Sequence, residues 1–195
     1  MPNKRTTFDR GLIVGLSDTV QKTIAARENT AESRFKSWCE RLGTKWSNRH
    51  NALSLEAAVS VMNADRANLQ FAHGERLILK SHRGFSQAFL DYFKVVVDEK
   101  TCCLAAWKTR RAIHVQDVTT SQHFSQPAIE VLLKDGIRAV SSAPLLTDAG
   151  RMIGVLSVHY CQPYAMYEKD LARFRRLATY IAELLDQRSS RTRSE

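Results

Sequence analysis

Two adjacent cysteines, Cys102 and Cys103, carry side chains that can act as nucleophiles among the 195 residues of this chain. A cysteine attacks through its thiolate, and reductive thiol chemistry also needs a second thiol that resolves the covalent intermediate. The other cysteines are Cys39 and Cys161, and the four form neither a C-x-x-C motif nor a zinc-ligand spacing. We therefore interpret Cys102 and Cys103 as small apolar packing residues. Unbridged cysteines fit a reducing compartment and predict a cytoplasmic protein.

The six histidines are the next group that could do chemistry, as metal or haem ligands. His73 and His82 lie near expected loops, whereas His114 and His159 are single residues of expected strands, and none forms an i, i+4 pair. The chain also lacks a glycine-rich phosphate loop, a Gly-x-Ser-x-Gly elbow and a carboxylate pair at functional spacing. The sequence therefore requires no metal or cofactor and contains no motif that predicts a hydrolase or transferase active site.

The net charge of +9 is concentrated at the two ends of the chain. Residues 1–50 carry ten Lys and Arg against five Asp and Glu, and residues 188–195 carry three against one, which leaves +2 for residues 51–187. A solvated helix face and a frayed tail explain this excess, so we do not expect a nucleic-acid partner. No stretch approaches the roughly 18 apolar residues of a membrane span, and no signal-peptide block follows the N-terminus, so no membrane partner is expected either.

Apolar spacing predicts helices at both ends of the chain. Leu12 to Trp46 reads as one long helix or as two, with a break at the polar residues Arg27 to Thr30. Ser54 is predicted to cap a short helix that Asp65 ends. The stretch from Glu168 to Gln187 is apolar along a broad stripe and predicts a terminal helix that must pack against another surface.

Three further helices are predicted in the middle of the chain. The first carries the aromatic stripe of Phe85, Phe89, Tyr92 and Phe93 and continues to Val96. The second includes Leu104 to Trp107, and the third runs from a Ser125 cap, with Pro127 in its first turn, to Gly136 as its C′ residue.

The strands are predicted as two hairpins and one isolated strand. The first hairpin pairs Asn68 to Phe71 with Arg76 to Leu79, and the second pairs Arg138 to Leu146 with Met152 to Tyr160. Ala112 to Val115 is the isolated strand. Hairpins interrupted by helices favour an antiparallel sheet with segregated helices, so the fold class is α+β.

Several short sequence motifs, taken in their order along the chain, resemble motifs of the GAF family of small sensory domains. The resemblance is strongest to GAF domains attached to bacterial signalling proteins such as hybrid histidine kinases. The motifs are Asn68-Leu69-Gln70, the run from His82 to Leu90, Asp117-Val118, Gly136 to Val140 with Ser142 and Pro144-Leu145, and Gly154 to His159. The resemblance covers residues 53–187. It makes residues 1–52 a long N-terminal helical extension and residues 188–195 a basic disordered tail.

The resemblance implies a central antiparallel sheet with helices on both faces. The terminal helices on one face would pair in a homodimer, and the other face would carry a pocket roofed by the intervening helices and loops. Because side chains alternate along a strand, Ser157 and His159 should face this pocket while Leu156 and Val158 face the terminal helices. The pocket residues that the resemblance implies are Phe85, Phe89, Phe124, Ser142, Ser157 and His159.

We expect from this a non-enzymatic sensory or regulatory module that binds a small molecule or docks a partner, and whose output reaches a separate signalling protein. The sequence lacks the Asn-Lys-Phe-Asp-Glu residues of cyclic-nucleotide-binding members and the Cys-His pair of bilin-attaching members. The alternative is the family's free methionine-R-sulfoxide reductases, which place a reactive cysteine in a segment comparable to that of Cys102 and Cys103. Their resolving Ala-Cys-Asp segment is replaced here by Thr120-Ser121-Gln122-His123.

Overall fold

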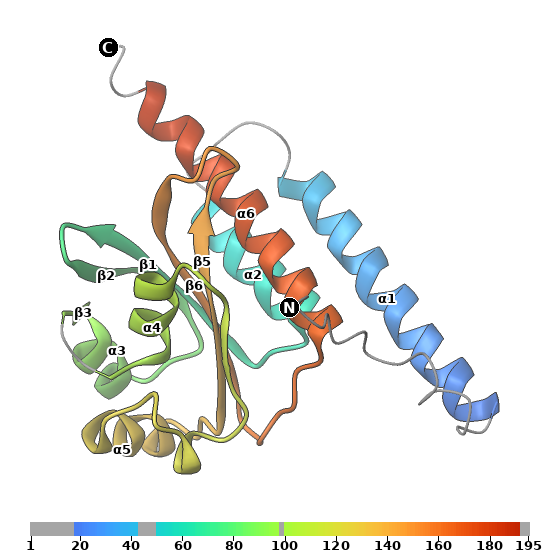
Figure 1. Ribbon diagram of the computed structural model, residues 1–195, viewed down its shortest axis with the longest axis horizontal. Helices are drawn as coiled ribbons and strands as arrows, with labels where there is room; N and C mark the ends of the chain where they lie inside the picture. The colour runs from blue at the N-terminus through green and yellow to red at the C-terminus, as the bar shows by residue number, and fades with distance from the viewer. Residues whose placement is uncertain (1–17, 43–49, 98–99, 192–195) are drawn as a thin grey trace, which may run out of the picture.

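The computed structural model describes residues 18–42, 50–97 and 100–191, which form an antiparallel sheet between two layers of helices (Figure 1). Within these residues the sheet has six strands in the order β3-β2-β1-β6-β5-β4, and every neighbouring pair is antiparallel. This confirms the α+β class and both expected hairpins. The strands are β1 (Arg66–His73), β2 (Arg76–Arg83), β3 (Val95–Val96), β4 (Ile113–Val115), β5 (Ala139–Leu146) and β6 (Met152–Tyr160).

The middle of the sheet brings distant segments of the chain into register. In β1 and β6, Asn68 lies opposite Ser157, and in β5 Ser142 lies opposite the same Ser157. Because side chains alternate along each strand, these three polar residues point to one face of the sheet. Gly154 permits the close pairing of β1 and β6, since a Cβ at that position would lie 2.0 Å from the backbone oxygen of Gln70.

One face of the sheet is covered by α2 (His50–Met62) and α6 (Glu168–Arg191), with α1 (Asp18–Leu42) packed outside them. Phe35, Trp38 and Leu42 of α1 are buried in the same apolar cluster as Phe174 and Leu177 of α6. The two long helices run parallel, because contacts advance together along them, from Glu32 with Arg176 to the Cys39 carbonyl with the Tyr180 hydroxyl.

The opposite face is covered by α3 (Gln87–Phe93), α4 (Cys102–Thr109) and α5 (Gln126–Lys134), with a short 3-10 turn η2 (Val118–Thr120) between them. Ser86 caps α3 by accepting the amide of Phe89, and Thr101 caps α4 by accepting the amide of Leu104. Gly136 follows α5 where the chain turns back to β5. Its φ of +70° is the left-handed conformation expected of a glycine just after the end of a helix, as predicted.

Some predicted element boundaries were wrong. Ser54 does not cap a helix, because α2 already begins at His50 and Ser54 is buried within it. Helix α3 ends at Phe93, and Val96 belongs to strand β3, where pairing with Leu77 of β2 overrides the helical spacing. The polar residues 27–30 do not break α1, whose described course is continuous.

The structure also bears on the predicted segments at the ends of the chain. Helix α2 spans the proposed boundary between residues 52 and 53, and α6 extends to Arg191, so the first four residues of the expected tail are helical. Residues 1–17, 43–49 and 192–195, which include Leu12 and Trp46, lie outside the described part of the chain. Within the described part, no helix is both long enough and apolar enough to cross a membrane.

Candidate functional site

A small cavity of about 20 Å³ lies between the sheet and the helices α3, α4 and α5. This volume is enough for about one water molecule. Strands β1, β5 and β6 supply its floor, and the helical side supplies aromatic residues and the first residues of α4. The lining residues are Asn68, Gln70, Phe89, Phe93, Thr101, Cys102, Cys103, Phe124, Leu132, Val140, Ser142, Ser157 and His159.

The structure brings together the residues that the resemblance placed in a pocket. Phe89, Phe124, Ser142, Ser157 and His159 all line the cavity. Phe85 does not line it but is half-buried and stacks on Phe89, with ring centroids 4.0 Å apart. The rings of Phe85 and His159 are nearly perpendicular, with centroids 4.9 Å apart. As the strand alternation predicts, Ser157 and His159 face this cavity, whereas Leu156 and Val158 pack in the cluster that contains α6.

Sequence reasoning missed two polar lining residues on β1, Asn68 and Gln70. Both belong to the Asn68-Leu69-Gln70 motif that resembles the GAF family, and their two-residue spacing puts them on one face of the strand. What the sequence did not show is that β1 lies next to β6, which sets Asn68 beside His159 across 91 residues of chain.

His159 is a neutral ring held by one hydrogen bond. Its Nε2 lies 2.8 Å from Oδ1 of Asn68, and because that oxygen can only accept, Nε2 carries the proton. Burial, with a smaller contribution from the positive charge of Arg66, lowers the pKa of His159 to about 3. Nδ1 is therefore an acceptor, and it is buried without a hydrogen-bond partner.

Gln70 leaves a second acceptor unpaired beside the cavity. Its Nε2 donates to the carbonyl of Phe93 at 3.4 Å, while its Oε1 is buried and has no partner. The two serine hydroxyls of the floor, Ser142 and Ser157, share one hydrogen bond at 2.7 Å, in which either can be the donor. Two buried side-chain atoms of the cavity lining have no hydrogen-bond partner, and both are acceptors, on His159 and Gln70.

The adjacent thiols line the cavity but are not activated. Burial raises the pKa of Cys102 to about 12 and that of Cys103 to about 11. The Cys102 thiol points its hydrogen toward the Ile113 carbonyl at 3.5 Å, and Cys103 lies 3.3 Å from the Thr101 hydroxyl. Since the thiolate is the reactive form of cysteine, this arrangement does not poise either residue for attack.

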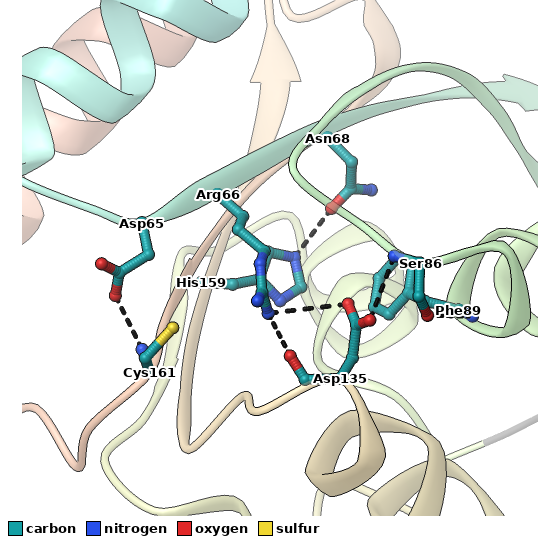
Figure 2. A network of polar contacts seen from close by, with 8 residues as sticks. All are labelled: Asp65, Arg66, Asn68, Ser86, Phe89, Asp135, His159 and Cys161. Carbon is teal, nitrogen blue, oxygen red and sulfur yellow. Dashed lines mark hydrogen bonds and ion pairs between the residues drawn. The ribbon is translucent and has the colours of Figure 1, made fainter.

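A network of polar contacts joins α3 and α5 to strand β1 (Figure 2). Asp135, at the end of α5, accepts the backbone amide of Ser86, the cap of α3, at 3.0 Å. Arg66, at the start of β1, donates to the Asp135 carbonyl and lies 3.6 Å from its carboxylate. One aspartate therefore ties two roof helices to the sheet next to His159.

Strand β6 connects the cavity with the helical face. Its residues alternate between His159 in the cavity and Val158 and Tyr160 in the cluster with α6. The segment that leads from β6 into α6 is tied to the sheet by His114, whose Nε2 contacts the Tyr164 carbonyl at 2.8 Å. A displacement of β6 at the cavity would therefore act directly on the packing of α6.

Beyond this cavity, the described residues form a further hollow and no metal-binding cluster. A shallow groove of about 200 Å³ between β2 and α3 is lined by largely exposed side chains, including Lys80, His82 and Lys94, and has no buried polar anchor among the described residues. In the part of the chain that the structure describes, no group of three or more His, Cys, Asp or Glu residues is placed to hold a metal ion.

Comparison with protein families gives one match. The family model for the GAF domain matches residues 52–185, which include all six strands and the lining of the cavity. A search of curated protein sequences gives no match.

Solved structures of the same shape come from proteins with different activities. The GAF domain of a phosphoenolpyruvate-protein phosphotransferase from Coxiella burnetii has 12% identity and a TM-score of 0.68, with 84% of this chain and 97% of that chain covered. A domain assigned to a two-component sensor histidine kinase from Sinorhizobium meliloti has 20% identity and a TM-score of 0.61, covering 74% and 94%. Free methionine-R-sulfoxide reductase from Neisseria meningitidis, in complex with its substrate, has 16% identity and a TM-score of 0.64, covering 82% and 91%. At these identities the likeness is one of fold.

Proposed function

This chain belongs to the GAF domain family, and from that premise we propose that it is a non-enzymatic sensory module that binds a small molecule and signals through its terminal helix. The observation that carries the proposal is the placement of strand β6. The strand presents Ser157 and His159 to a cavity with unsatisfied polar atoms and presents Leu156 and Val158 to the face covered by α6. An event in the cavity and the position of α6 are therefore coupled through one strand.

The described cavity corresponds to a closed state of this site. With room for about one water molecule, it admits a larger ligand only when roof side chains move. The stacked rings of Phe85 and Phe89, and the Asp135 network behind them, are the elements that would have to shift. Opening of this roof is the conformational change that would report ligand binding.

A second candidate function is a free methionine-R-sulfoxide reductase. It is favoured by the fold of the Neisseria meningitidis enzyme and by the fact that Cys102 and Cys103 both line the cavity. Against it stand the raised pKa values of both thiols. Neither of the other two cysteines lines the cavity, since Cys39 lies on α1 beyond the opposite face of the sheet and Cys161 follows β6.

The proposal includes a homodimer through the terminal helices, output to a separate signalling protein, a cytoplasmic location and no nucleic-acid or membrane partner. The dimer is expected because the helices before Leu53 and the helix from Glu168 to Gln187 have more apolar length than one face of a small sheet needs. The structure gives Phe35, Trp38 and Leu42 partners within the same chain. The dimer interface would therefore use the outer faces of α1 and α6.

Native mass spectrometry of the freshly purified protein, combined with light scattering, tests the proposal. We expect a dimer that retains a small molecule, or that takes one up with a change in the hydrogen exchange of α6. A monomer whose α6 amides do not respond to any cavity ligand contradicts the sensory mechanism. In parallel, the protein is assayed for reduction of free methionine-R-sulfoxide with thioredoxin. Turnover that is lost in Cys102→Ser or Cys103→Ser would replace the sensory function with the reductase.

A further inference from the structure

The cavity lining, apart from its shape, carries information on the chemistry of the ligand. None of the thirteen lining residues is Lys, Arg, Asp or Glu. The nearest charged pair, Arg66 and Asp135, is engaged with itself and with the Ser86 amide. A carboxylate, phosphate or ammonium group would therefore enter a buried site without a counter-charge, which is strongly unfavourable.

The polar atoms of the lining that have no hydrogen-bond partner indicate whether the ligand donates or accepts hydrogen bonds. Nδ1 of His159 and Oε1 of Gln70 are buried, and both are acceptors. His159 is 4% exposed and Gln70 is 1% exposed, so bulk water does not satisfy these atoms. Unpaired buried acceptors carry a desolvation cost that is recovered only when a donor is supplied. A ligand with N–H or O–H groups supplies such a donor in place of the one water molecule for which the cavity has room, whereas an anion would be repelled.

The opposite wall of the cavity is suited to an acceptor and to an apolar body. Thr101, Cys102 and Cys103 are the cap and first residues of α4, where backbone amides at the start of the helix can donate hydrogen bonds to a carbonyl oxygen. Phe89, Phe93 and Phe124 supply aromatic surface. A ligand that complements all of these surfaces has a carbonyl oxygen for the start of α4, an N–H donor for His159 and Gln70, and a flat apolar part for the aromatic side chains.

Building on the proposed sensory function, we infer that this site takes an uncharged small molecule that donates hydrogen bonds to His159 and Gln70, with a primary carboxamide on an apolar ring as the matching class. The inference excludes carboxylates and cations. It also assigns a role to Gln70, which the sequence did not single out as a binding residue.

Three nearly isosteric probes test the inference on the full-length protein. Benzamide offers a neutral group with N–H donors, acetophenone replaces the NH₂ by a methyl group, and benzoate replaces it by a charged oxygen. Dissociation constants come from NMR titrations that follow the His159 ring nitrogens and the Gln70 side-chain amide. We expect benzamide to bind about tenfold more tightly than either other probe, with a shift at His159 Nδ1, because one or more buried hydrogen bonds are gained.

Variants locate the effect. Gln70→Met, which keeps the length of the side chain, should reduce benzamide affinity about tenfold and leave acetophenone binding unchanged. Gln87→Met on the exposed surface of α3 is the matched control and should change neither. The comparison of probes on the unchanged protein stands even where Gln70→Met does not fold.

The outcomes separate this inference from the proposed function. Equal or tighter binding of benzoate or acetophenone at the cavity would overturn the ligand class and leave a sensory site in place. Failure of all three probes to shift His159 or Gln70 at millimolar concentration, with one ordered water on His159 Nδ1, would overturn the ligand class and the ligand-binding site together. Tight benzamide binding without any response of α6 would support the class and contradict the signalling route.

Discussion

Oδ1 of Asp135 lies 3.0 Å from the backbone nitrogen of Ser86, so that the end of α5 accepts a hydrogen bond from the cap of α3 across 49 residues of chain. The side chain of Asp135 is 5% exposed, and Arg66 approaches its other carboxylate oxygen. This contact joins the end of α5 to the start of α3, the helix that carries Phe89 (Figure 2). The first prediction concerns its removal.

Asp135→Ala should loosen the roof more than Asp135→Asn, because asparagine keeps an oxygen that can accept the Ser86 amide. We expect alanine to lower the free energy of unfolding by about 1–3 kcal/mol and to accelerate hydrogen exchange at the Ser86 amide. Asp91→Ala, on the exposed side of α3, is the control. Equal exchange of the Ser86 amide in the alanine and asparagine variants would show that the carboxylate does not hold the roof.

The second prediction concerns pH. The folded-state pKa of His159 is lowered from 6.5 to about 3. At pH values between 6.5 and 3, this histidine is therefore protonated in the unfolded chain and neutral in the folded chain. The unfolded state then binds more protons, and the free energy of unfolding falls as the pH falls from 6.5 toward 3, by up to about 1.4 kcal/mol per pH unit. His159→Gln removes the titrating ring, and this part of the slope should disappear.

Urea unfolding at a series of pH values from 6.5 to 4 measures this slope. The matched control is His82→Gln, at an exposed histidine of β2. A parallel pH profile for the parent protein and His159→Gln would mean that the ring is protonated in the folded state.

The third prediction concerns the thiols. Because burial raises the pKa of Cys102 to about 12 and that of Cys103 to about 11, both should resist iodoacetamide at pH 8 until the protein unfolds. Cys161 is only partly buried and should be alkylated earlier. Mass spectrometry of peptides sampled over time gives the order. Rapid labelling of Cys102 or Cys103 in the folded protein would favour the reductase.

The fourth prediction concerns the pairing of β1 with β6, which sets Asn68 beside His159. Gly154→Ala would place a Cβ 2.0 Å from the Gln70 backbone oxygen and 2.9 Å from the Cα of Phe71. We expect a loss of about 3 kcal/mol or more in the free energy of unfolding, since neither backbone atom can move without breaking the ladder.

Gly74→Ala is the control for this substitution. Gly74 lies in the turn between β1 and β2 with φ +59° and has no atom within 4 Å of an added Cβ. Its replacement should cost only the strain of a left-handed residue, about 1–2 kcal/mol. Thermal unfolding followed by circular dichroism compares the two, and a smaller loss for Gly154→Ala than for Gly74→Ala would contradict the packing at β6.

Much of the fold was predictable because its signals are local. Turn residues and alternating strands predicted both hairpins, and helical spacing predicted the helix that begins at Glu168. The errors came where tertiary contacts override local preference. Val96 continues an apolar helical spacing but pairs with Leu77, and Ser54 resembles a cap although α2 begins four residues earlier.

The same division holds for the site. Strand alternation alone decided that Ser157 and His159 share one face while Leu156 and Val158 share the other, because the side-chain period of a strand is two residues whatever the strand pairs with. Only the tertiary structure decided that β1 lies beside β6, that Asn68 holds the His159 ring, and that Gln70 and His159 are each left with an unpaired acceptor. Only the tertiary structure decided, too, that the aromatic residues of the roof nearly fill the cavity. Register between distant strands and the volume left between packed side chains depend on every neighbour at once, and no local spacing in the sequence carries that information.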